Sequence, residues 1–102
     1  RDFIYIDDLI NVILKILKSH NAVGEIINIG SGKPINIKKL ILKICKLTKG
    51  GKPQFGKIPL RKDEIIKLYP KLSKVKKLFD WKPKINLEKG LKKTIKYFKK
   101  QL

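Results

Sequence analysis

Apolar residues along this chain recur at helical spacing in four stretches. In residues 8–18 the polar positions lie three and four apart and apolar side chains fill the rest, which predicts a helix with one narrow polar stripe. Residues 37–47 predict a second helix with Asn36 as its N-cap. Ser73 can cap a short third helix, and a final amphipathic helix is expected to start after Asn86.

Short runs of β-branched and aromatic residues predict strands between these helices. Residues 3–6 are expected to form a strand that leads into the first helix, with Asp7 as the N-cap. Residues 25–29 suit a strand that is buried on both faces of a parallel sheet. Residues 55–58 and 65–69 are further candidates for extended segments. The first half therefore has the strand and helix alternation of an α/β fold.

Composition limits the chain to one small domain and raises one alternative function. Its 102 residues include 26 basic and 8 acidic side chains, for a formal charge of +18. Such a charge attracts polyanions, so a stand-alone lysine-rich module that binds nucleic acid or an anionic membrane is an alternative. The lysines are scattered along the sequence, however, and isoleucine is similarly over-used among the apolar residues, which favours a solvated lysine-rich surface. A purely structural or interaction domain is a third possibility.

The usual catalytic and metal-binding sets are missing from the sequence. Cys45 and His20 are each the single residue of their type, so neither a disulfide nor a Ser-His-Asp or Cys-His set is expected. Asp7 and Asp8 are interpreted as a helix cap and a dipole partner. Residues 30–32, Gly-Ser-Gly, resemble only part of a phosphate-binding loop. No apolar run approaches the ~18 residues that span a bilayer, and a cytoplasmic, soluble protein is expected.

The two arginines are the most informative polar residues. Of the 26 basic residues only Arg1 and Arg61 are arginines, and each has an acidic residue within two positions, near an expected turn or strand end. The planar guanidinium can hold two phosphate oxygens at once, which a lysine ammonium cannot do. The arginines are therefore candidate phosphate ligands, although two ordinary surface arginines remain the alternative.

Four motifs, read together and in order, carry a family resemblance. They are RDFIYIDD at residues 1–8, INIGSG at 27–32, RKDE at 61–64, and WKPK with LEKGL at 81–84 and 87–91. In this order and spacing they resemble the C-terminal third of an extended short-chain dehydrogenase/reductase, the NAD-dependent epimerase/dehydratase family that acts on nucleotide sugars. The resemblance covers essentially the whole chain.

The resemblance implies a two-part enzyme of which residues 1–102 form a single partial domain. The expected fold is α/β: the C-terminal fragment of a Rossmann-type enzyme, with a late sheet strand and a small mixed α/β substrate-binding domain. NAD or NADP would bind mainly to an N-terminal Rossmann portion that also carries a Tyr-x-x-x-Lys pair. Tyr5, Tyr69 and Tyr97 all lack a lysine four residues later. This chain, which begins on Arg1 without a methionine, is thus expected to hold no catalytic, cofactor-binding or metal-binding residue and to be inactive alone.

The same resemblance assigns four substrate-binding residues. Arg1 matches an arginine that contacts the nucleotide diphosphate, and Phe3 matches the aromatic residue beside it. Arg61 matches a second diphosphate arginine, and Glu64 an acidic residue near the ribose hydroxyls. The implied ligand is a nucleoside-diphosphate sugar, and the implied full-length enzyme is a homodimer with no specific nucleic-acid partner and no membrane span.

The sequence departs from the family pattern at two positions. Asp63 stands where the family usually has glycine and adds a negative charge near the expected phosphates. Lys71 stands where the family usually has aspartate. The first departure bears on the loop geometry around Arg61.

Overall fold

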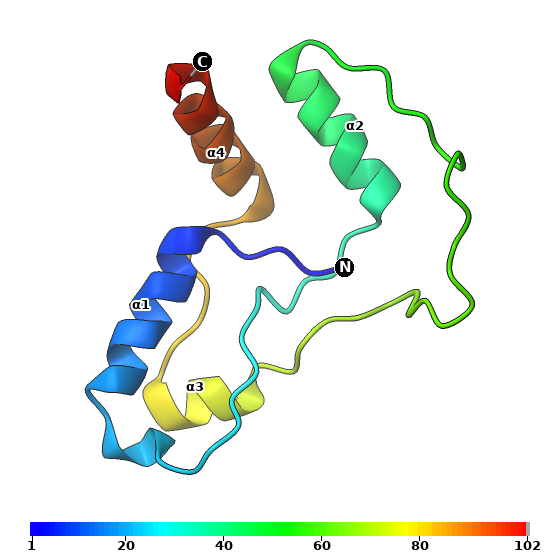
Figure 1. Cartoon of the computed structure of the whole chain (residues 1–102). Coiled ribbons are helices and arrows are strands. Elements are labelled where there is room, and N and C mark those ends of the chain that lie inside the picture. Colours follow the sequence, from blue (N-terminus) through cyan, green and yellow to red (C-terminus); the bar gives the residue numbers. More distant parts are fainter. Residues whose placement is uncertain (102) are drawn as a thin grey trace.

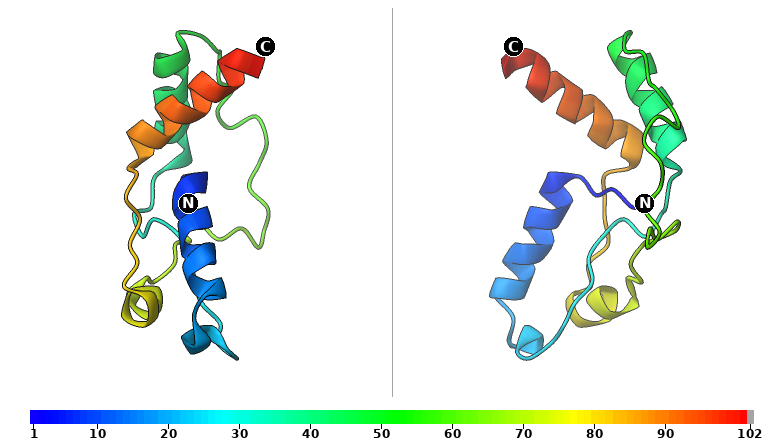
Figure 2. Two further views of the ribbon diagram at one scale, coloured as in Figure 1. Left: turned by 90° about the vertical axis from the view of Figure 1, so that its left-hand side faces the viewer. Right: turned by 45° about the vertical axis from the view of Figure 1, so that its right-hand side comes forward.

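Residues 1–101 are described by a computed structural model, and they form an open arrangement of helices. In chain order the elements are α1 (Ile6–Leu17), a 3-10 turn η1 (His20–Ala22), α2 (Ile37–Thr48), α3 (Ser73–Phe79) and α4 (Leu87–Gln101). In Figure 1, α1 and α3 occupy the lower half and α2 and α4 the upper half, and a long loop joins α2 to α3. The Cα radius of gyration is 16.4 Å, whereas a compact domain of this length has about 13 Å. The views in Figure 2 show how far the two helix pairs spread apart.

The start of α1 differs from the prediction. Its N-cap is Tyr5, which makes no side-chain cap hydrogen bond, and Asp7 lies exposed in the first turn, so the prediction of Asp7 as the cap is wrong. Asp7 can still interact favourably with the positive end of the helix dipole. Asp8 is only 2% exposed, because its carboxylate accepts hydrogen bonds from the backbone N–H groups of Lys84 (3.1 Å) and Ile85 (2.9 Å). Asp8 therefore attaches the segment before α4 to α1.

Asparagine caps begin two of the other helices. The Asn36 side chain accepts a hydrogen bond from the Lys38 backbone N–H at 2.8 Å, which confirms the predicted cap of α2. Asn86 accepts one from a backbone N–H in the first turn of α4 at 2.9 Å. Ser73 does not cap α3, because it is the first helical residue and the N-cap position belongs to Leu72.

None of the expected strands forms within residues 1–101. Those strands were expected at residues 3–6, 25–29, 55–58 and 65–69. A strand exists only when a neighbour completes its ladder of hydrogen bonds, and here Arg1 and Ile35 are the one pair of described residues that exchange backbone hydrogen bonds in both directions, at 3.1 and 2.8 Å. Ile26 is 83% exposed, whereas Ile27 and Ile29 pack against the core, so the segment expected to be buried on both faces of a sheet is covered on only one side here.

A small core lies where α1 and α3 meet. Val12 and Val75 are fully buried, and Phe79 and Trp81 are 9% and 4% exposed in the same cluster. The burial of Trp81, which follows α3, anchors the segment that leads to α4 in this core. Leu40 of α2 is the only other large apolar side chain of the described residues that is buried. The upper helix pair therefore contributes little to the core.

Candidate functional site

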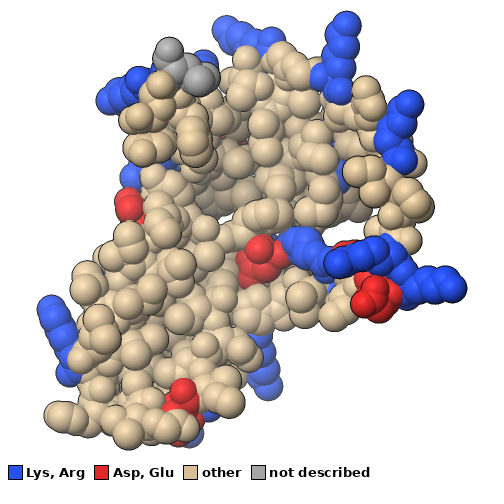
Figure 3. Space-filling model, in the orientation of Figure 1, with Lys and Arg blue, Asp and Glu red and all other residues tan. Residues whose placement is uncertain are grey.

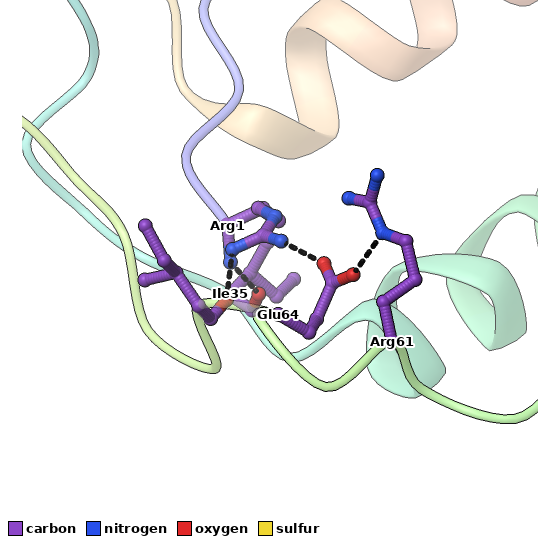
Figure 4. A network of polar contacts seen from close by, with 5 residues as sticks. Arg1, Ile35, Arg61 and Glu64 are labelled. Atoms are coloured by element: carbon purple, nitrogen blue, oxygen red, sulfur yellow. Dashed lines mark hydrogen bonds and ion pairs between the residues drawn. The ribbon is translucent and has the colours of Figure 1, made fainter.

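Three of the four predicted site residues come together at one place. Two backbone hydrogen bonds with Ile35 hold Arg1 next to the N-terminus of α2. Arg61 and Glu64 belong to one turn, which is closed by a hydrogen bond from the Glu64 N–H to the Arg61 carbonyl (3.1 Å). Figure 4 shows the Glu64 carboxylate between the two guanidinium groups. These three side chains are called the arginine cluster below.

The Glu64 carboxylate bridges both arginines. One oxygen accepts from Arg1 Nη2, and the other accepts from Arg61 Nε at 3.0 Å. Arg1 also donates from Nη1 to the backbone carbonyl of Ile65. The Arg61 side chain is 78% exposed, and its two terminal nitrogens extend beyond the contact and bond to no other described residue. The two arginines therefore differ: Arg1 is engaged on two nitrogens, and Arg61 keeps the outer edge of its guanidinium open.

The charges of the cluster lower the pKa of Glu64. The hydrogen bond from Arg61 is the main cause, and the positive charges of Arg61 and Arg1 and the Arg1 hydrogen bond act in the same direction. Together they outweigh partial desolvation of the carboxylate, which raises its pKa. Glu64 is thus ionised at neutral pH, and the cluster carries two positive charges and one negative charge.

An open pocket of about 600 Å³ lies beside this cluster. Arg1 and Glu64 line it, together with Lys67, Leu60 and Ile66. Residues 34–37, which lead into α2, and Ile65 complete the wall. A pocket of this size with apolar walls and a few charged groups is typical of a small-molecule site.

Phe3 lies apart from the arginine cluster. Its side chain is 41% exposed and lines two smaller cavities, of about 170 and 160 Å³, on the side of the segment that precedes α4. Residues 85–87 line both cavities with it. The structure does not bring Phe3 to the arginine cluster, and its contact with substrate stays a prediction.

The Gly-Ser-Gly turn is occupied by a carboxylate that the sequence interpretation did not assign. Asp2 accepts hydrogen bonds from the backbone N–H groups of Ser31 (3.2 Å) and Gly32 (2.8 Å) and from the Ser31 hydroxyl. A phosphate would need these same N–H groups, so the turn does not fit a dinucleotide phosphate. Its role is to fix the N-terminal segment. Among residues 1–101 no three His, Cys, Asp or Glu side chains gather into a metal site.

Comparisons with known proteins place these residues in a family context. The sequence pattern of the GDP-mannose 4,6 dehydratase family matches residues 1–94. UDP-glucuronate 4-epimerase of Thermodesulfobacterium geofontis is 37% identical over 103 residues, covering 100% of this chain and 31% of the relative. CDP-abequose synthase of Salmonella muenchen is 38% identical over 97 residues, covering 93% of this chain and 33% of the relative.

A solved structure has a similar fold. The crystal structure of UDP-glucose 4-epimerase with UDP-glucose from Thermotoga maritima aligns with a TM-score of 0.79 and 30% sequence identity, over 99% of this chain and 32% of that one. The chain thus spans about a third of the length of the proteins that it matches. No helix within residues 1–101 is both long and apolar enough to cross a membrane.

Proposed function

Because this chain belongs to the GDP-mannose 4,6 dehydratase family and corresponds to the C-terminal part of an extended short-chain dehydrogenase/reductase that acts on nucleotide sugars, we propose that it binds the nucleotide sugar. The complete enzyme would be an NAD(P)-dependent epimerase, dehydratase or ketoreductase. Its substrate would be a nucleoside-diphosphate sugar.

The observation that carries this proposal is the arginine cluster at the pocket. Two guanidinium forks can neutralise a diphosphate, and Arg1 and Arg61 lie on either side of one carboxylate. The open edge of Arg61 supplies one fork, and Arg1 lines the pocket wall. Glu64 has lone pairs left to accept from ribose hydroxyls, and Phe3 would contact a more distant part of the substrate.

The chemistry of the complete enzyme would depend on groups outside these residues. NAD or NADP would supply hydride transfer when bound to an N-terminal Rossmann portion. In the Gly-Ser-Gly turn of this chain, the Ser31 and Gly32 N–H groups already donate to Asp2. This chain would bind and orient the substrate only, and would be inactive alone. A homodimer and a cytoplasmic location, with Cys45 as a free thiol, belong to the same proposal.

The alternative of a nucleic-acid or membrane module gains no support. The relatives reported above are named as nucleotide-sugar enzymes. On the face drawn in Figure 3 one group of basic side chains lies at the right, beside acidic groups, and the other basic side chains lie singly around the edge.

A binding titration of the complete protein tests the proposal. UDP-, CDP- and GDP-sugars are titrated by calorimetry, and the tightest ligand is then used with variants. Arg61→Ala and Arg1→Ala are expected to weaken binding tenfold or more, since each removes charged hydrogen bonds to the diphosphate, of about 1.5–3 kcal/mol apiece.

The matched control is Lys62→Ala. Lys62 is exposed beside Arg61 and carries the same charge, so its removal should change the affinity by less than about threefold if only long-range attraction is lost. Equal, small effects of all three substitutions would contradict the proposal.

A further inference from the structure

Arg1 and Asp2 are neighbours whose side chains go to different parts of the structure. The Arg1 side chain lines the pocket and contacts Glu64, whereas Asp2 is not part of the described pocket wall. Asp2 instead accepts hydrogen bonds from the Ser31 N–H (3.2 Å), the Gly32 N–H (2.8 Å) and the Ser31 hydroxyl. From outside the pocket, Asp2 therefore fixes the backbone from which the Arg1 side chain extends.

The backbone of Arg1 is attached to the same stretch of chain a second time. It exchanges two hydrogen bonds with Ile35, at 3.1 and 2.8 Å. In Figure 1 the N-terminus accordingly lies against the segment that leads into α2. One attachment is thus made by the backbone of Arg1 and the other by the side chain of Asp2. Two attachments fix the direction of this segment as well as its position, which a single attachment would not do.

The loop that carries the other two members of the arginine cluster, residues 61–64, meets the same turn. A Cβ at Gly30 would lie 2.5 Å from Pro70 Cγ and 2.6 Å from Asp2 Oδ2, so Pro70 and Asp2 both pack directly against this glycine. Pro70 belongs to the segment between α2 and α3, as residues 61–64 do. The Gly-Ser-Gly turn therefore supports both parts of the cluster, because it holds Arg1 through Asp2 and the loop through Pro70.

The orientation of Arg1 matters because a guanidinium binds a phosphate through directed N–H groups. Its long side chain has several rotatable bonds, and a precise site needs supporting hydrogen bonds around the residues that touch the ligand. We propose that Asp2 is a positioning residue, which binds the Gly-Ser-Gly turn and thereby orients Arg1 toward the diphosphate. This inference rests on the proposed function of the arginine cluster.

The charge of Asp2 distinguishes positioning from simple electrostatics. A carboxylate next to Arg1 repels a diphosphate, so by charge alone its neutralisation would strengthen binding. Loss of positioning predicts the opposite change. In Asp2→Asn the shape is kept, but an NH2 group replaces one of the two acceptor oxygens and cannot accept from a backbone N–H. The direction of the change in affinity therefore decides between the two effects.

The experiment uses the complete protein and the tightest ligand among the UDP-, CDP- and GDP-sugars titrated above. Calorimetry at constant ionic strength is expected to show at least about fivefold weaker binding by Asp2→Asn. Asp7→Asn is the matched control, because it removes the same charge from an exposed position in the first turn of α1. Its affinity should change by less than about twofold. Thermal unfolding checks that both variants are folded.

Variants at Ser31 test the same contact and replace Asp2→Asn if that protein does not fold. Ser31→Ala deletes the hydroxyl that donates to Asp2, and it should weaken binding about threefold. Ser31→Thr keeps a hydroxyl and should stay within about twofold of the unsubstituted protein. Where Asp2→Asn does not fold, equal affinities of these two variants overturn the proposal.

A double-mutant cycle separates positioning from a general structural role. In the Arg1→Ala protein no guanidinium remains to be oriented, so adding Asp2→Asn should change the residual affinity by less than about twofold. A general loss of structure would instead weaken binding by the same factor with and without Arg1. That result would overturn the positioning role of Asp2.

Failure of this inference and failure of the proposed function give different results. If Asp2→Asn binds the nucleotide sugar as tightly as the unsubstituted protein or more tightly, while Arg1→Ala and Arg61→Ala still weaken binding, the positioning role is wrong and the proposed function stands. If Arg1→Ala and Arg61→Ala leave binding unchanged, both are wrong.

Discussion

Glu64 is the residue on which the electrostatics of the site depend. Its pKa is lowered from 4.5 because the native state offers its charged form two guanidinium partners. A group with a lowered native pKa stabilises the fold above its unfolded pKa, and this contribution is lost as the pH falls through the native pKa. The charge of Glu64 therefore makes the native state more stable at neutral pH than in acid.

We expect a pH-dependent difference between the complete protein and its Glu64→Gln variant. The free energy of unfolding of the unsubstituted protein should exceed that of the variant by a constant amount above about pH 5. The difference should shrink as the pH falls below 4.5, where the unfolded carboxylate takes up its proton. Denaturant titrations at several pH values measure it. A difference that is the same at pH 7 and pH 3 would contradict the assigned ion pairs.

The residues of the candidate site could be predicted from the sequence, but the residues that they contact could not. Arg1, Arg61 and Glu64 were found because arginine is rare in this lysine-rich chain and because the motifs resemble a family. Glu64 bridges the two arginines only because it contacts Arg1, which lies 63 residues away in the chain. Asp8 was interpreted as a dipole partner, and its bonds to residues 84 and 85 join positions 76 and 77 apart. No local pattern encodes such distances.

At the scale of the elements, helices were predicted better than strands. The spacing of apolar residues gave all four α-helices, with ends within a few residues of those observed, because this period is a property of the local sequence. The predicted strands are absent from the described chain because pairing needs a neighbour that these residues do not supply. The fold class is supported instead by the likeness to the Thermotoga maritima epimerase.

The turn before α2 is the element most sensitive to added volume. A Cβ at Gly30 would lie 2.5 Å from Pro70 Cγ and 2.6 Å from Asp2 Oδ2, whereas a Cβ at Gly50 would meet no atom within 4 Å. Gly30→Ala is therefore expected to destabilise the complete protein by about 1–3 kcal/mol. Gly50→Ala, the matched control, should change stability by less than about 0.5 kcal/mol. Thermal unfolding of both variants measures these changes in stability. Equal changes for the two variants would contradict the close contacts assigned to Gly30.

At the scale of the whole molecule, the chain exposes more surface than a compact protein. Its accessible surface is 8709 Å², whereas about 5,900 Å² is expected for a folded monomer of this mass. Part of the excess is an apolar face of α1, on which these side chains are 43–75% exposed: Ile6, Ile10, Ile13, Leu14 and Leu17. An apolar surface of this kind is typical of a part that packs against another domain.

We therefore expect this chain, produced alone, to be poorly stable or to self-associate. Sedimentation velocity should show oligomers that grow with concentration, and thermal unfolding should be broad. Replacing Ile10 and Ile13 by serine should reduce the association, because both lie on the exposed face of α1. A monomer that unfolds in one sharp transition would contradict this expectation.

The central claim is that the arginine cluster binds the diphosphate of a nucleotide sugar. The most direct measurement is a crystal structure of the complete protein with its tightest nucleoside diphosphate. The diphosphate oxygens are expected within about 3 Å of the guanidinium nitrogens of Arg1 and Arg61, with Glu64 accepting from a ribose hydroxyl. A diphosphate bound elsewhere, with Glu64 still bridging both arginines, would contradict the claim.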